Sequence, residues 1–135
     1  MAPIILIHGA WMGSWCWDKV HPHLSAGGHR PLAIDLPGRP NNEMAAEDVS
    51  LDAFTGDVLQ VLDGFAEPAI LVGHSLGGVT LSEVAERAPG QGQALAYVTA
   101  FMLHDGESAR EVLRDDDSIV TASRKISNDG LDHAR

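Results

Sequence analysis

The amino-acid sequence predicts an α/β fold, in which helices pack on both faces of a parallel sheet. Short apolar runs alternate along the chain with longer stretches whose apolar residues recur at helical spacing. The runs are rich in isoleucine, leucine and valine, as is typical of parallel strands that are buried on both faces. The 135 residues are 44% hydrophobic and 21% charged, which suits one small globular domain. The four predicted strands are residues 3–7, 30–36, 69–72 and 94–102.

Helical spacing fills the stretches between these strands. Trp15–Ala26 ends at a pair of glycines, and Pro22 within it predicts a helix that starts late or is kinked. Ser50 is a good N-cap for a helix that continues to Gly64. A third helix runs from residue 79 to the Pro-Gly pair at 89–90. Beyond the fourth strand we expect a short helix at 106–113, a hairpin of 119–121 with 125–127, and the beginning of a helix at 131–135.

Charge and composition exclude several classes of partner. The formal net charge of −10 disfavours binding to nucleic acid and to anionic membranes. No apolar run approaches the roughly 20 residues of a membrane span, and the first residues do not resemble a secretory signal. Cys16 is the single cysteine, so no internal disulfide can form, and its tryptophan neighbours favour a packed thiol over a reactive one. We therefore expect a cytoplasmic protein.

The motif that carries chemistry is Gly-His-Ser-Leu-Gly at residues 73–77, which matches the G-x-S-x-G nucleophile elbow. It lies between a predicted buried strand and a predicted helix, which is the context that the motif requires. A serine on such a sharp turn needs small neighbours, because larger side chains would collide with the strand or helix. We therefore predict that Ser75 is a nucleophile, and that His74 supports packing or the loop rather than acting as a base.

A second element is the loop after the first strand, His8-Gly9-Ala10-Trp11. Where a nucleophile elbow is present, one oxyanion-binding N–H belongs to the residue after the serine, and the other comes from the loop after an earlier strand. This rule nominates the N–H groups of Leu76 and Ala10. Backbone donors in a fixed loop suit the role because they need no reorganisation as negative charge develops.

Five segments of the chain resemble one known family in the order in which they occur. The segments are Ile-Leu-Ile-His-Gly-Ala-Trp at residues 5–11, Trp-Cys-Trp at 15–17, Ala-Ile-Asp-Leu-Pro-Gly at 33–38, Leu-Val-Gly-His-Ser-Leu-Gly-Gly at 71–78 and Asp-Gly-Glu-Ser at 105–108. Together they resemble the α/β-hydrolases grouped with plant methylesterases and hydroxynitrile lyases, including bacterial esterase relatives. The resemblance covers residues 3–108, and its first two segments are more selective than the elbow.

This resemblance implies a serine esterase that hydrolyses a small carboxylic ester without a cofactor. Gly9 and Trp11, with Trp15 and a cap region, would shape the substrate pocket. The implied strand order is second-first-third-fourth, in a partial α/β-hydrolase fold truncated before the last strands of the family sheet. Residues 1–103 would then be the N-terminal part of the core, and residues 104–135 the start of the cap.

Two departures from the hydroxynitrile lyases favour ester hydrolysis over cyanohydrin cleavage. Those enzymes resemble versions of the first loop that carry threonine, where this chain has Gly9. They also tend to have an acidic residue before the serine, where this chain has His74. A lyase of that type remains the alternative enzyme, and a non-catalytic binding protein or inert fragment is the alternative from another class.

The base and the acid of a catalytic triad are expected outside this chain. The family order is serine, then acid, then histidine, and only His104 and His133 follow Ser75. Neither is favoured as the base, since His104 begins a loop and the acid beside His133, Asp132, is its direct neighbour in sequence. Asp105 is better explained as a loop residue than as the acid. We therefore interpret the chain as a truncated product or a piece of a longer sequence, with little esterase activity alone.

The other histidines give no indication of a metal site. His21 and His23 are two residues apart, a spacing that does not place them on one helical face with each other, and His29 lies beyond the predicted helix. No glycine pattern for dinucleotides or phosphates occurs, so we expect no cofactor and no metal. The expected partner is a small-molecule ester, with no nucleic acid and no membrane, and a homodimer is left open.

Overall fold

The computed structural model describes residues 2–114. The chain divides into two compact units, Met1–Met102 and Leu103–Arg135, and each is considered by itself. The hairpin expected at 119–127, the last helix, Asp132 and His133 lie outside the described residues. The assignment of residues 104–135 to a cap stays a prediction.

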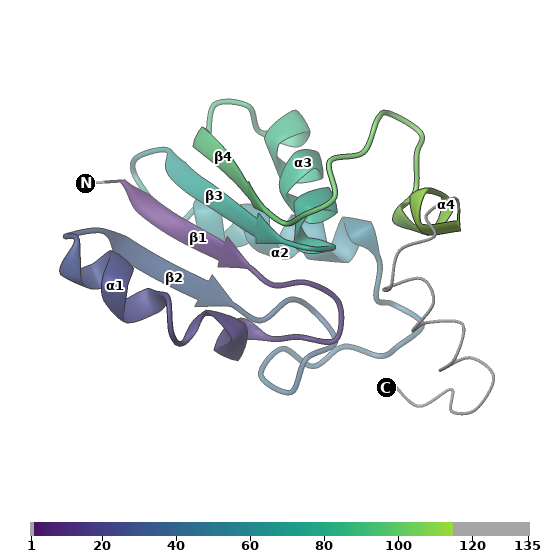
Figure 1. The fold of residues 1–135 in the computed structure, drawn as a ribbon, viewed down its shortest axis with the longest axis horizontal. Helices are drawn as coiled ribbons and strands as arrows, with labels where there is room; N and C mark the ends of the chain where they lie inside the picture. Colours follow the sequence, from purple (N-terminus) through teal and green to yellow (C-terminus); the bar gives the residue numbers. More distant parts are fainter. Residues whose placement is uncertain (1, 115–135) are drawn as a thin grey trace. The chain divides into compact units, whose positions relative to one another are not determined.

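The first unit contains a sheet of four parallel strands in the order β2-β1-β3-β4 (Figure 1). Both the parallel pairing and the strand order agree with the sequence prediction. Ile7 at the end of β1 pairs with Ile34 of β2 and Gly73 of β3, so these strands end together at one edge of the sheet. The strands are β1 (Pro3–Ile7), β2 (Arg30–Ile34), β3 (Ala69–His74) and β4 (Gly92–Val98).

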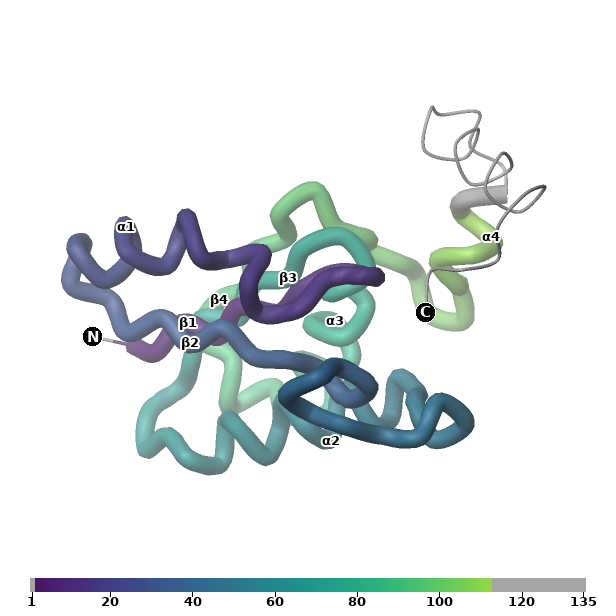
Figure 2. Tube along the Cα trace, turned by 90° about the horizontal axis from the view of Figure 1, so that it is seen from below, coloured from purple at the N-terminus to yellow at the C-terminus, as the bar shows by residue number. Residues whose placement is uncertain are grey.

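Helices cover both faces of this sheet, as expected. Alternate residues of β1 point to opposite faces, and all five are buried. On one face, Ile5 and Ile7 join a core with residues of α2 (Leu51–Leu62) and α3 (Gly77–Arg87). On the other, Ile4 and Leu6 pack with Trp17 of the 3-10 helix η1 (Ser14–Trp17) and with Leu24 of α1 (His21–Ala26). Figure 2 shows α1 and α2 on opposite sides of the strands.

Several boundaries differ from those predicted, each for a local reason. The helix expected over Trp15–Ala26 is two helices, and Pro22 lies in the first turn of the second, where its missing N–H costs no hydrogen bond. β2 ends at Ile34, two residues early, because the Leu36 N–H bonds to a side chain instead. β4 ends before Thr99, whose positive φ of 45° is incompatible with a strand.

The second unit contributes one helix among the described residues, α4 (Ala109–Arg114). It begins three residues later than the predicted 106. Ser108 sets the start, because its hydroxyl accepts from the Glu111 N–H at 3.2 Å while the Glu111 carboxylate accepts from the Ser108 N–H at 3.0 Å. This reciprocal pair is a capping box, with serine at the N-cap and glutamate three residues on.

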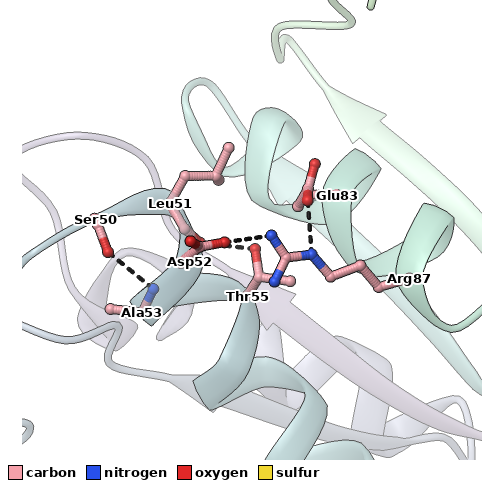
Figure 3. A network of polar contacts seen from close by, with 7 residues as sticks. All are labelled: Ser50, Leu51, Asp52, Ala53, Thr55, Glu83 and Arg87. Atoms are coloured by element: carbon pink, nitrogen blue, oxygen red, sulfur yellow. Dashed lines mark hydrogen bonds and ion pairs between the residues drawn. The ribbon is translucent and has the colours of Figure 1, made fainter.

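Helices α2 and α3 are joined at the surface by polar contacts (Figure 3). The Ser50 hydroxyl caps α2 by accepting from the Ala53 N–H at 3.1 Å, as the sequence predicts. Arg87 of α3 pairs with Glu83 and reaches across to Asp52 of α2. These ion pairs are solvent-exposed and contribute little. The packing of the two helices is therefore determined by the buried side chains that they share with Ile5 and Ile7 of β1.

Candidate active site

Ser75 occupies the turn between β3 and α3 in a strained backbone conformation. Its φ is +52°, in the left-handed region that serine seldom adopts. Its carbonyl accepts hydrogen bonds from the Gly78 N–H at 3.1 Å and the Phe101 N–H at 3.0 Å. The side chain is partly exposed, and its hydroxyl has no hydrogen-bond partner among residues 2–114. The turn thus presents a free hydroxyl at the N-terminus of a helix.

The glycines of this turn are required by close backbone contacts. A Cβ atom on Gly73 would lie 2.8 Å from the Gly77 carbonyl oxygen. One on Gly77 would lie 2.7 Å from the carbonyl oxygens of both Ile7 and His8. One on Gly78 would overlap the carbonyl oxygen of Phe101. These neighbours are backbone atoms that cannot rotate away, so the motif is fixed by steric exclusion.

The loop after β1 lies directly against Ser75. A Cβ atom on Gly9 would be 2.8 Å from the Ser75 Cβ and 3.0 Å from the His74 carbonyl oxygen. The N–H groups of Ala10 and Leu76, the two predicted oxyanion donors, have no acceptor among residues 2–114. Two unpaired backbone donors therefore belong to the segments that meet at Ser75, as stabilisation of an oxyanion requires.

His8 joins the ends of β1 and β2 through its ring. The side chain is buried, and its Nε2 accepts a hydrogen bond from the Leu36 N–H at 3.1 Å. Nδ1 lies 2.8 Å from the Gly9 carbonyl oxygen and must therefore carry the proton that it donates. Burial lowers the pKa of His8, and the positive charge of Arg39 acts in the same direction. The ring is consequently a neutral imidazole with its tautomer fixed.

Asp35 fastens the first loop to the end of β2. Its carboxylate accepts from the Ser14 N–H at 2.7 Å, the Ser14 hydroxyl at 3.0 Å and the Asn41 amide at 2.9 Å. Partial burial raises the pKa of Asp35, but these hydrogen bonds outweigh it and leave the pKa below its usual value. The group is therefore an ionised carboxylate that organises two loops.

Two tryptophans that follow β1, Trp11 of the first loop and Trp15 of η1, are exposed. Trp11 is 66% exposed and has a positive φ of 60°, and Trp15 is 61% exposed.

His74 contacts Trp17 edge-to-face, with ring centroids 6.4 Å apart, which agrees with a packing role. Burial raises the pKa of the Cys16 thiol, and Asp18 adds to this effect. The thiol is thus in its unreactive protonated form.

In the first unit, the histidines other than His8 and His74 have no hydrogen bond to Ser75. His21 bonds through Nε2 to the Pro31 carbonyl oxygen at 3.2 Å, which ties α1 to β2. Within the described part of the chain, no group of three or more potential metal ligands occurs, and no helix is long and apolar enough to span a membrane. His104 and Asp105 are exposed residues of the second unit, and the interpretation that neither belongs to the catalytic triad stays a prediction.

A parallel sheet with a strained serine between a strand and a helix defines the α/β hydrolase class. The sequence matches the alpha/beta hydrolase family over residues 4–130, and the chain belongs to that family. It is 37% identical to Methylesterase 9 of Arabidopsis thaliana over 105 residues, which cover 76% of this chain and 41% of that one. It is 35% identical to a carbendazim hydrolyzing esterase of Nocardioides sp. (strain SG-4G), over 84% of this chain and 48% of the relative.

Solved structures give the same result. A pyrethroid hydrolase from Sphingobium faniae JZ-2 superimposes with a TM-score of 0.73 at 36% identity, covering 79% of this chain and 43% of that chain. The chain thus spans less than half the length of each of these three relatives.

Sequence reasoning missed two residues that organise this site, His8 and Asp35. Each is a polar residue that directly follows a strand at the same edge of the sheet as Ser75. That position is the signal by which both could have been found, because ligand sites of open parallel sheets lie outside the carboxyl ends of the strands.

Proposed function

We propose that this chain supplies the nucleophile and the oxyanion hole of a carboxylic ester hydrolase, with Ser75 as the nucleophile. The observation that carries the proposal is the left-handed backbone of Ser75, held between β3 and α3 with its hydroxyl free of partners among residues 2–114. Strain of this kind costs free energy and persists where function requires it. The similarity to proteins named as esterases supports the same conclusion.

The proposed reaction is acyl transfer in two steps. The Ser75 hydroxyl oxygen attacks the ester carbonyl carbon while a base takes its proton, and the carbonyl oxygen becomes an oxyanion held by the N–H groups of Ala10 and Leu76. When the intermediate collapses, the alcohol leaves with that proton and the acyl group stays on Ser75. Water then attacks the acyl-serine and releases the acid. The base and its orienting acid would follow Ser75 in the family order.

The proposed substrate is a small carboxylic ester. The relatives are named for ester hydrolysis, and one is named as a methylesterase. The exposed rings of Trp11 in the first loop and Trp15 in η1 provide apolar surface for an acyl or alcohol group. Gly9 also belongs to this proposed pocket, because it borders Ser75 directly.

Cleavage of a cyanohydrin is the second enzymatic candidate, and the packing at Gly9 weighs against it. The similar lyases are expected to have threonine in the first loop. Here a Cβ at position 9 would lie 2.8 Å from the Ser75 Cβ, so no threonine fits without moving the nucleophile. A non-catalytic protein is the remaining candidate, and reactivity of Ser75 distinguishes it from an esterase.

A fluorophosphonate probe tests the proposal, applied to the protein as its gene encodes it. We expect labelling of wild type, no labelling of Ser75→Ala, and unchanged labelling of Ser25→Ala, an exposed serine of α1. Hydrolysis of p-nitrophenyl acetate should follow the same pattern. Labelling that survives Ser75→Ala would remove Ser75 from the mechanism, and absence of labelling in wild type would favour a non-catalytic protein.

A further inference from the structure

Gly9 gives the first loop a freedom that the proposed oxyanion hole must restrict. Glycine is required there, because a Cβ would lie 2.8 Å from the Ser75 Cβ. Glycine also populates a wider range of φ and ψ than any other residue. The plane of the Gly9–Ala10 peptide, which carries the Ala10 N–H, is therefore not held by a side chain at position 9.

The ring of His8 supplies that restraint. Its Nδ1–H donates to the Gly9 carbonyl oxygen at 2.8 Å, a shorter contact than the 3.4 Å from the Met12 N–H to the same oxygen. Its Nε2 is occupied by the Leu36 N–H at 3.1 Å. Because the ring is buried and both nitrogens are used, rotation would break two buried hydrogen bonds. The ring thus acts as a fixed support between the ends of β1 and β2.

The Gly9 carbonyl and the Ala10 N–H belong to one peptide unit. No peptide bond among residues 2–114 is cis, so the carbonyl and the N–H of this unit point in opposite directions. Fixing the direction of the carbonyl therefore fixes the direction of the N–H.

We propose that His8 is a positioning residue of the oxyanion hole, which holds the Gly9 carbonyl through Nδ1–H and so aims the Ala10 N–H at the developing oxyanion. The inference rests on the proposed function, in which Ala10 is one of the two donors. Loss of this alignment acts on the transition state and not on the bound ester. It therefore lowers kcat and leaves KM nearly unchanged.

Two substitutions of His8 each remove one of the two hydrogen bonds of the ring and keep the other. The side-chain amide of His8→Asn occupies the place of Nδ1, so this variant keeps a donor for the Gly9 carbonyl and loses the acceptor for the Leu36 N–H. The amide of His8→Gln reaches the place of Nε2, so it keeps the acceptor and loses the donor. Each variant loses one buried hydrogen bond, which makes them matched controls for stability.

The experiment uses the protein as its gene encodes it, and measures kcat and KM for p-nitrophenyl acetate per labelled active site, with Ser75→Ala as the blank. Removal of an oxyanion donor lowers kcat by about 100- to 1,000-fold, so we expect misalignment in His8→Gln to cost on the order of 10- to 100-fold. His8→Asn should stay within about fivefold of wild type. Equal kcat losses in the two variants, or losses that follow thermal stability, would overturn the inference.

A second readout does not depend on activity. Residual dipolar couplings report the direction of the Ala10 N–H vector, which should be retained in His8→Asn and altered in His8→Gln. An unaltered vector in His8→Gln would overturn the inference even in an active enzyme. Absence of Ser75-dependent hydrolysis in wild type would instead refute the proposed function, and the positioning of Ala10 by His8 would then be decided by the couplings.

Discussion

The two segments that meet at the candidate site are held in different ways. The turn from β3 to α3 is fixed by steric exclusion, since Gly73 and Gly77 lie where any Cβ would collide with backbone atoms. The loop after β1 is fixed instead by buried or partly buried polar side chains, His8 and Asp35. A steric constraint is sensitive to added volume, whereas a polar constraint is sensitive to lost hydrogen bonds and to pH. Mutations can therefore address each segment separately.

Adding a methyl group to the turn should have the largest effect. Gly77→Ala would place a Cβ 2.7 Å from two backbone carbonyl oxygens, which cannot rotate away. Overpacking typically costs about 1–3 kcal/mol, and we expect the upper end or more here. Urea unfolding would measure the loss. The control is Gly56→Ala in α2, where nothing lies within 4 Å, and a gain of about 0.5–1 kcal/mol is expected. Equal effects at the two glycines would contradict a steric constraint.

Removing the carboxylate of Asp35 should have the next largest effect. Asp35→Ala loses three hydrogen bonds to a charged acceptor that solvent also reaches, so we expect a loss of about 1–2 kcal/mol at pH 7. Because the folded-state pKa lies below that of the unfolded chain, this contribution is present above about pH 4 and is lost as the pH falls through the folded-state pKa. Unfolding curves at pH 7 and pH 3 would measure the stability loss in Asp35→Ala and its decrease at low pH.

The control for this prediction is Asp48→Ala. Asp48 is an exposed residue whose side chain has no hydrogen bond with residues 2–114, so its removal should leave stability within about 0.5 kcal/mol of wild type. A difference between wild type and Asp35→Ala that stays constant from pH 7 to pH 3 would argue against an ionised carboxylate.

The strain at Ser75 predicts a smaller change of the opposite sign. Ser75→Gly removes the Cβ from a residue at φ +52°, where a side chain costs roughly 1–2 kcal/mol. Glycine also loses more entropy on folding, so we expect a net gain of about 0.5 kcal/mol with complete loss of labelling. Ser75→Ala keeps the Cβ and should show no such gain. A destabilised Ser75→Gly would mean that the serine side chain contributes to folding.

The pH response of His8 should be the smallest of the four effects, since protonation there affects one buried hydrogen bond. The folded-state pKa is lowered, so the neutral ring contributes stability above about pH 6.5, and this contribution declines as the pH falls toward the folded-state pKa. Imidazole nitrogen shifts should show the Nδ1–H tautomer at pH 7.5. The stability difference between wild type and His8→Gln should shrink from pH 7.5 to pH 5.5. A ring that is already protonated at pH 7.5 would refute the assignment.

The same contrast explains what the sequence could predict. The turn at Ser75 is encoded by five consecutive residues, and the start of α2 by the serine directly before it, Ser50, so both follow from local patterns. The contact of His8 with Leu36 spans 28 positions, and that of Ser14 with Asp35 spans 21. No local pattern encodes such pairs, because they depend on the adjacency of β1 and β2. The sequence did not predict the early end of β4 at Val98, because the residue with positive φ that follows it is Thr99, and only a glycine there would have indicated such a conformation.

The pairing of β1 with β3 also determines when the two segments can meet during folding. The Ser75 turn can form within one strand–helix unit, but the Gly9 loop reaches it only after Ile7 pairs with Gly73, a contact between residues far apart in the chain. Closing so long a loop is entropically unfavourable and slow. A nascent chain with only local structure would carry the serine turn without the loop opposite it. A slip of one residue between β1 and β3 would displace Gly9 by roughly 3.3 Å along the strand, which separates the two segments in an otherwise paired sheet.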